Sequence, residues 1–181
     1  MKRSMKLFAV GIVFSSVLCF TQCRKHRTKP KPDNPYGLPN ATQTGAGVFA
    51  CLINGQKFIA GHRRPNFPDG AEVQDDSLYL NAPPASSSYV VIGIYVMPFL
   101  NEKKEYIIDS ENVMAVLVID STCQGFTGRT RSFSKVGNLV ITKFDTTLRI
   151  VSGTFDGLAF PIPGCDTLHV TNGRFDYYYY N

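Results

Sequence analysis

Carboxylates cluster in the segment FPDGAEVQDDS, in which Asp69, Glu72, Asp75 and Asp76 could offer oxygen ligands to calcium. Their spacing does not match an EF-hand loop, which needs ligands at alternate positions and a glutamate at the twelfth position. We therefore interpret this segment as a solvated acidic loop and expect no metal site there.

Two further constellations could support catalysis. Asp145 and Asp156 could form a carboxylate pair for general acid and base chemistry, but Asp145 fits a turn and Asp156 fits an exposed strand position. His62 and His169 stand in unrelated contexts, without the further ligands that a zinc site requires. The chain also lacks a G-x-S-x-G elbow, an H-E-x-x-H helix and a phosphate-binding glycine loop. We expect a protein that is not an enzyme and has no catalytic residue, metal or cofactor.

Consecutive tyrosines from Tyr177 to Tyr180 are the most unusual local composition of the chain. Side chains alternate along a strand, so Phe175, Tyr177 and Tyr179 would share one face, and Tyr178 and Tyr180 the other. One face must belong to the core. The other face either packs beneath a loop or forms an exposed platform for a sugar or a peptide.

Arg63 and Arg64 follow His62 in a segment with the composition of a loop. Such a pair is usually a pair of solvated surface charges. The alternative is that the two arginines form part of a binding site for an anionic ligand. The candidate ligand-binding residues are therefore Arg63, Arg64, Tyr178 and Tyr180.

Strand patterns separated by turn residues fill the chain from Val48 to Tyr180, and no window sustains helical periodicity beyond a turn or two. The clearest is a hairpin of Val48 to Ile53 and Gln56 to Ile59 around Asn54-Gly55. The other predicted strands cover 78–80, 89–97, 106–108, 113–119, 139–144, 148–155 and 168–179. Because the loops are too short for crossover helices, we expect antiparallel neighbours. The predicted fold is all-β, an antiparallel meander that forms a β-sandwich or a flattened barrel, with no long helix apart from the N-terminal segment.

Two glycines, Gly153 and Gly173, lie inside predicted strands. Glycine in a strand indicates a β-bulge or a place where another group approaches the backbone closely. We interpret both glycines as structural rather than catalytic.

The N-terminus combines Lys2, Arg3 and Lys6 with an apolar run from Leu7 to Phe20. This run falls below the ~20 residues that a membrane-spanning helix needs. We therefore interpret residues 1–22 as a cleaved signal peptide, and an uncleaved membrane helix is the alternative.

The end of this segment predicts lipidation. Phe20-Thr21-Gln22-Cys23 places an apolar residue three positions before a cysteine, as lipoprotein signals do, although Gln22 departs from the usual small residue. Cys19 fits less well, because Ser16 occupies its apolar position. We predict that palmitate or similar acyl chains on Cys23 anchor the chain to the lipid bilayer.

Residues 23–46 read as the lipidated cysteine and a tether, because proline recurs there with almost nothing apolar between. Residues 24–33 carry five Lys or Arg against one Asp, a net charge of plus four, which suits a segment beside anionic head groups. Residues 47–181 carry eleven Lys or Arg against thirteen Asp or Glu, a net charge of minus two. We expect a single all-β domain over 47–181 and no binding to nucleic acid.

Removal of the signal peptide leaves Cys51, Cys123 and Cys165 beside Cys23, in a compartment that permits disulfides. Cys51 lies inside an apolar strand pattern, where a thiol behaves as a small hydrophobe. Cys123 and Cys165 lie at predicted strand ends among polar and turn residues. We predict a disulfide between these two, and a reactive thiol at Cys123 is the alternative.

Three ordered elements near the C-terminus, GNLVITKFD at 137–145, IVSGTF at 150–155 and VTNGRFD at 170–176, resemble a family of small, functionally uncharacterised Bacteroidetes lipoproteins. The opening segment FACLING at 49–55 is similar to that family's first hairpin, while the middle of the domain is unmatched. The resemblance implies a cysteine before the one at Cys165, in agreement with the predicted disulfide. It supplies no catalytic residue.

We expect a membrane-anchored lipoprotein that binds a small ligand, a glycan or a protein partner without catalysis. A purely structural or assembly role in the envelope is the alternative. An accessible apolar cavity would favour the first and a solid core the second. Basic residues follow the anchor, whereas surface-exported lipoproteins of this family's hosts tend to carry acidic ones there, so we expect the outer membrane, on its periplasmic face.

Overall fold

A computed structural model describes residues 36–61, 70–85, 90–100, 104–109, 113–120 and 129–180, which belong to a compact unit of Tyr36–Asn181. The described residues form strands and no helix, so the predicted all-β fold is confirmed. The strands are β1 (Val48–Ile53), β2 (Gln56–Ile59), β3 (Gly70–Gln74), β4 (Ser77–Ala82), β5 (Val90–Val96), β6 (Glu105–Ile107), β7 (Val113–Asp120), β8 (Arg129–Ser134), β9 (Asn138–Asp145), β10 (Ile150–Asp156), β11 (Leu158–Phe160) and β12 (Leu168–Tyr180). None of the described residues forms a helix long and apolar enough to cross a membrane.

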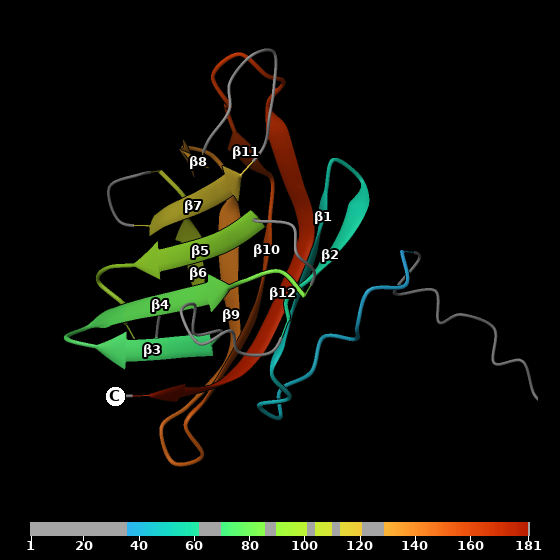
Figure 1. Cartoon of the computed structure of the whole chain (residues 1–181). Coiled ribbons are helices and arrows are strands. Elements are labelled where there is room, and N and C mark those ends of the chain that lie inside the picture. Colours follow the sequence, from blue (N-terminus) through green and yellow to red (C-terminus); the bar gives the residue numbers. More distant parts are fainter. Residues whose placement is uncertain are drawn as a thin grey trace, which may run out of the picture. The chain divides into compact units, whose positions relative to one another are not determined.

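The strands form one curled sheet in the order β6-β9-β10-β12-β3-β4-β5-β7-β8 (Figure 1). The hairpin of β1 and β2 joins the sheet through β12, and β11 also pairs with β12. One pair departs from the expected antiparallel pattern: β12 runs parallel to β3 where Tyr179 pairs with Ala71 and Tyr180 with Glu72. The C-terminal strand therefore lies within the sheet, with partners on both sides.

The segment predicted as an acidic loop contains strand β3, and this correction has a local cause. Ala71 is buried while Glu72 is exposed, so the strand alternates as a half-buried strand should. The turn after β3 is formed by Asp75 and Asp76, whose φ angles are 48° and 57°. A two-residue turn with positive φ at both positions usually contains glycine, and aspartate takes that place here. Strands β8 and β11 were also missed.

Aromatic side chains fill the space that the curled sheet encloses. Phe49 and Phe155 lie with their ring centroids 5.1 Å apart, and Phe144 stacks on Tyr179 at 5.2 Å. The largest fully buried aromatic side chains are Phe49, Phe155, Phe160 and Phe175. This packing is close to that of a solid core, the feature expected of a structural role.

Both strand glycines adjoin closely packed groups, as predicted. A Cβ atom on Gly173 would overlap the ring of Phe155, and one on Gly153 would overlap the carbonyl oxygen of Val140. The register between β10 and β9 shifts between Ser152 and Gly153, which marks a β-bulge.

Serine side chains join β8 to β11. The Ser134 hydroxyl accepts a hydrogen bond from the Ala159 amide at 2.9 Å and donates to the Val136 carbonyl at 2.7 Å. The Ser132 hydroxyl donates to the Pro161 carbonyl at 2.7 Å. Both serines are buried, so side-chain hydrogen bonds hold the last strand of the sheet against the strand that pairs with β12.

Candidate functional site

Strand β12 presents its tyrosines in the predicted alternation. Phe175, Tyr177 and Tyr179 are 2%, 3% and 5% exposed and belong to the core. Tyr178 and Tyr180 are 54% and 55% exposed on the opposite, outer face of the sheet. The two candidate ligand-binding tyrosines therefore lie at the surface.

Tyr180 begins a row of side chains that crosses the outer face of four strands. Tyr180 pairs with Glu72 of β3, Glu72 pairs with Tyr79 of β4, and Tyr79 pairs with Tyr95 of β5. The ring centroids of Tyr79 and Tyr95 are 4.6 Å apart, and Tyr79 is 44% exposed. We call Tyr180, Glu72, Tyr79 and Tyr95 the tyrosine row.

Within the tyrosine row, Tyr79 interacts with the Tyr95 hydroxyl and with the charge of Glu72. A hydrogen bond with Tyr95 raises the pKa of Tyr79 above its usual value, and the charge of Glu72 acts in the same direction. The Tyr95 hydroxyl lies 3.3 Å from the hydroxyl of Ser77 and donates to the sulfur of Met97 at 3.1 Å. The row thus combines aromatic rings that can stack on a ligand with a carboxylate that can accept hydrogen bonds.

A second polar centre on the outer face surrounds Asp176, which is 1% exposed. Asp176 Oδ2 accepts hydrogen bonds from the Thr42 hydroxyl at 2.6 Å and from the amides of Thr44 and Ala46 at 3.0 and 3.1 Å. Asp176 Oδ1 accepts from the Gly45 amide at 2.8 Å. We call residues 36–47 the strap, because this segment crosses β12 and is held there by the carboxylate.

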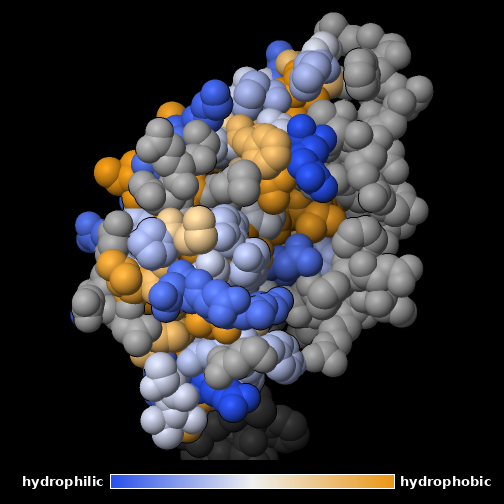
Figure 2. Space-filling model, turned by 90° about the vertical axis from the view of Figure 1, so that its left-hand side faces the viewer, coloured by the Kyte–Doolittle hydropathy of each residue, from blue (hydrophilic) through white to orange (hydrophobic). Residues whose placement is uncertain are grey.

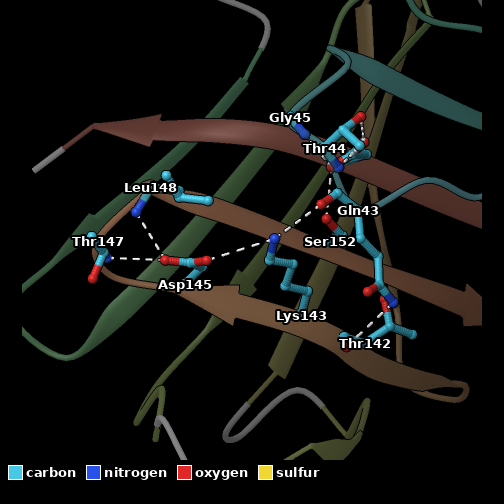
Figure 3. A network of polar contacts seen from close by, with 10 residues as sticks. Gln43, Thr44, Gly45, Thr142, Lys143, Asp145, Thr147, Leu148 and Ser152 are labelled. Carbon is cyan, nitrogen blue, oxygen red and sulfur yellow. Dashed lines mark hydrogen bonds and ion pairs between the residues drawn. The ribbon is translucent and has the colours of Figure 1, made fainter.

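Lys143 extends this network toward the end of β9 (Figure 3). Its ammonium group donates to the Gln43 carbonyl at 3.1 Å and lies 3.6 Å from the carboxylate of Asp145. Asp145 accepts from the amides of Thr147 and Leu148 at 3.1 and 2.8 Å, so its predicted role as a turn residue is confirmed. Backbone amides therefore donate to both carboxylates, Lys143 lies beside Asp145 alone, and this arrangement is structural.

A groove of about 460 Å³ opens beside the short strand β6. Its lining residues are Glu105, Tyr106, Ile107, Asp109, Val113, Asn138 and Val140.

In the described ranges, no group of three His, Cys, Asp or Glu side chains gathers where it could hold a metal ion. On the face of the domain shown in Figure 2, hydrophobic residues lie among hydrophilic ones.

The other predicted site residues have different outcomes. Cys165 is disulfide-bonded, and Cys51 is free and buried. Cys23 and Cys123 lie outside the described residues, so lipidation and the pairing with Cys165 stay predictions. Arg63 and Arg64 also lie outside the described residues, so their part in a ligand site stays a prediction.

Sequence reasoning missed most of the tyrosine row and the role of Asp176. The sequence predicts a short strand at Tyr79 but a loop at Glu72, so it does not place the two side chains next to each other. The available signal is the alternation of apolar and polar residues in AEVQ after Gly70. This alternation predicts a strand at the position of β3, with Glu72 on its exposed face. For Asp176 the signal is absent, because its partners in the strap lie 130 to 134 positions earlier in the chain.

Comparison of the chain with models of protein families, with curated proteins and with solved structures gave no match. The resemblance to the Bacteroidetes lipoproteins therefore rests on the sequence elements alone.

Proposed function

We propose that this chain is an exported lipoprotein, anchored through Cys23 on the periplasmic face of the outer membrane, whose domain binds a glycan without catalysis. The tyrosine row is the observation that carries the binding proposal. It places two tyrosines that are about half exposed, Tyr79 and Tyr180, on either side of the exposed carboxylate of Glu72.

The location of the binding surface follows from what occupies the rest of the domain. Buried aromatic side chains fill the interior, and the strap occupies the outer face around Asp176. Besides the groove beside β6, the described part of the chain offers a ligand the outer face of β3, β4 and β5, where the tyrosine row lies. A ligand bound there would contact the sheet from outside rather than enter a cavity.

The chemistry of the row suits a sugar. Tyrosine rings supply rigid apolar area for the C–H face of a pyranose, and their hydroxyl groups stay available for hydrogen bonding. Glu72 can accept hydrogen bonds from sugar hydroxyl groups and fix the orientation of the ring. The row contains no group positioned as a nucleophile with an adjacent base, which fits binding without turnover.

A structural or assembly role in the envelope is the second candidate. The observation that favours it is the aromatic packing of the core, which gives the domain the character of a rigid spacer. This role predicts that no soluble envelope glycan binds.

Titration of the full chain with soluble peptidoglycan fragments and neutral oligosaccharides would test the binding proposal. The chain contains no tryptophan, so intrinsic fluorescence reports on tyrosine directly. We expect saturable binding by the wild type that falls about tenfold or more, ~1.4 kcal/mol, in Tyr79→Ala. The matched control is Phe133→Ala, which removes another aromatic ring of similar exposure (41%) from β8 and should bind as the wild type does.

Each outcome of this titration selects one candidate. Unchanged affinity in Tyr79→Ala would remove the tyrosine row as the site, and the absence of any binding would favour the structural role. Labelling with a fatty-acid analogue tests the anchor separately, because Cys23→Ala should lose the label and Cys19→Ala should keep it. Protease digestion of the domain on intact cells would contradict the periplasmic location.

A further inference from the structure

The strap is attached to the domain at three separate places, of which Asp176 is the central one. The carboxylate receives amide hydrogen bonds from consecutive residues, Thr44, Gly45 and Ala46, and the hydroxyl of Thr42. It also receives the Ser152 hydroxyl from β10 at 2.7 Å. Burial alone would raise the pKa of Asp176, but these hydrogen bonds lower it well below its usual range. The carboxylate is therefore ionised and saturated with donors that come mostly from one segment.

The second attachment lies near the start of the strap. Leu38 is 3% exposed and packs with Ala50 and Leu52 of β1 in a small apolar cluster separate from the main core. The Arg174 guanidinium donates to the Pro39 carbonyl at 3.0 Å. This end of the strap is thus fixed by both apolar burial and a charged hydrogen bond.

The third attachment is a close packing contact. Gly45 has a φ of +75°, and a Cβ atom at this position would lie 2.6 Å from Cε2 of Tyr178. Only glycine satisfies both the backbone conformation and the space. Gly45 therefore lets the strap lie directly against the ring of an exposed tyrosine.

We propose that the strap is a clamp: residues 36–46, which the sequence assigned to the tether, are fixed to the domain and do not contribute to the length of the tether. The consequence is a shorter reach. Residues 24–35 can span about 40 Å when fully extended, whereas residues 24–46 could span about 80 Å. The distances assume the anchor proposed at Cys23, while the clamp itself does not depend on lipidation.

The clamp also determines which residues of the domain would first bear a pulling force applied to the tether. Tension on the tether would act first on Leu38, Pro39 and the Asp176 hydrogen bonds, before it reached β1. Residues 43–46 are hydrogen-bonded to β9 and to β12, and both of these strands have a partner strand on each side (Figure 3). The domain is thus held through two interior strands of the sheet rather than through the end of one strand.

Hydrogen–deuterium exchange of the full chain would test the clamp. In the wild type we expect the amides of Thr44, Gly45 and Ala46 to exchange at least tenfold more slowly than in an unstructured peptide. Gly45→Ala should abolish this protection, because the new methyl group meets the ring of Tyr178. Gly164→Ala is the matched control, since Gly164 has the same φ of +75° but nothing within 4 Å of the added methyl group.

A second variant keeps the test decisive if Gly45→Ala disturbs folding. Thr42→Val removes the hydroxyl donor to Asp176 with little change in shape and should accelerate exchange in the strap several-fold while amides of β10 and β12 remain protected. Free exchange of the strap in the wild type would overturn the clamp. Unchanged protection in both Gly45→Ala and Thr42→Val would overturn it equally, whereas loss of glycan binding or of lipidation would leave it standing.

Discussion

Ser152 and Asp176 face each other across β10 and β12, and the Ser152 hydroxyl donates a 2.7 Å hydrogen bond to Asp176 Oδ1. Both residues lie on the outer face of the sheet, yet Ser152 is 0% and Asp176 is 1% exposed. The cover comes from the strap, whose amides complete the coordination of the carboxylate. The charge of Asp176 within β12 is thereby stabilised by the neutral amide and hydroxyl donors that surround it.

Asp176→Asn should destabilise the domain at neutral pH by about 3 kcal/mol, because several buried donors lose an ionised acceptor. The wild-type pKa is lowered, so this contribution is fully present above the unfolded-state value of about 4 and is lost as the pH falls below it. Urea unfolding between pH 7 and pH 2 should therefore show a steeper loss of stability in the wild type than in Asp176→Asn. Asp166→Asn, at an exposed position, should follow the wild type. Parallel pH profiles for wild type and Asp176→Asn would contradict the assignment.

Ser134→Ala should weaken the contact between β8 and β11. The substitution leaves the Ala159 amide and the Val136 carbonyl without their buried partner, at a cost of about 1–3 kcal/mol. Amide exchange should accelerate at Ala159 first, while the pairs between β10 and β12 keep their protection. Uniform acceleration across the sheet would show that the two strands do not separate locally.

Gly173→Ala should destabilise the domain by about 2–3 kcal/mol, since its methyl group would overlap the ring of Phe155 and force that ring to move. Gly93→Ala is the comparison, because its methyl group would lie 3.0 Å from the end of the Val116 side chain and 3.6 Å from the Leu80 carbonyl oxygen, which is ordinary contact. Thermal unfolding should place the midpoint of Gly173→Ala clearly below that of Gly93→Ala. Equal midpoints would mean that the ring of Phe155 moves aside at little cost.

Tyr95→Phe should lower the pKa of Tyr79 toward its usual value. The hydrogen bond with Tyr95 is the largest cause of the raised pKa of Tyr79, so its removal lets the phenolate form at a lower pH. Absorbance titration at alkaline pH, with Tyr79→Phe subtracted to isolate the signal, would measure the shift. A Tyr79 titration that does not respond to Tyr95→Phe would contradict the hydroxyl contact within the tyrosine row.

Cys51 should be unreactive in the folded protein. Burial raises the pKa of its thiol to about 12, so the nucleophilic thiolate is scarce at neutral pH, and the side chain is also inaccessible. A thiol reagent should label Cys51 only after unfolding in denaturant. Stoichiometric labelling of this residue in the native protein would show that β1 opens readily.

The sequence specified the local features of the fold better than the contacts between distant segments. Asn54-Gly55 marked the hairpin of β1 and β2 with correct limits, because this residue pair suits the positive φ angles of a tight turn. Strand β3 was missed because Asp75 and Asp76 form the equivalent turn without glycine. The alternation of β12 was predictable from Phe175 onward, since one face had to be apolar.

The candidate site was less accessible to sequence reasoning. The tyrosine row depends on the parallel pairing of Tyr180 with Glu72, which brings together strands about a hundred positions apart. Asp176 occupies an alternating polar position that would normally face water, and nothing within β12 indicates that the strap covers it. Contacts of this kind arise from topology, which short-range patterns do not encode.

The alternation along β12 implies an asymmetry in how the domain tolerates genetic change. Odd-numbered positions from 175 to 179 supply the core, while Asp176 receives the strap and Tyr180 begins the tyrosine row. Single substitutions would affect one of these surfaces at a time. Insertion or deletion of one codon within 175–180 would exchange the two faces over the rest of the strand. Core aromatic side chains would then become exposed, and polar side chains would become buried at the same time. Length within β12 should therefore be far more constrained than residue identity at any one of its surface positions.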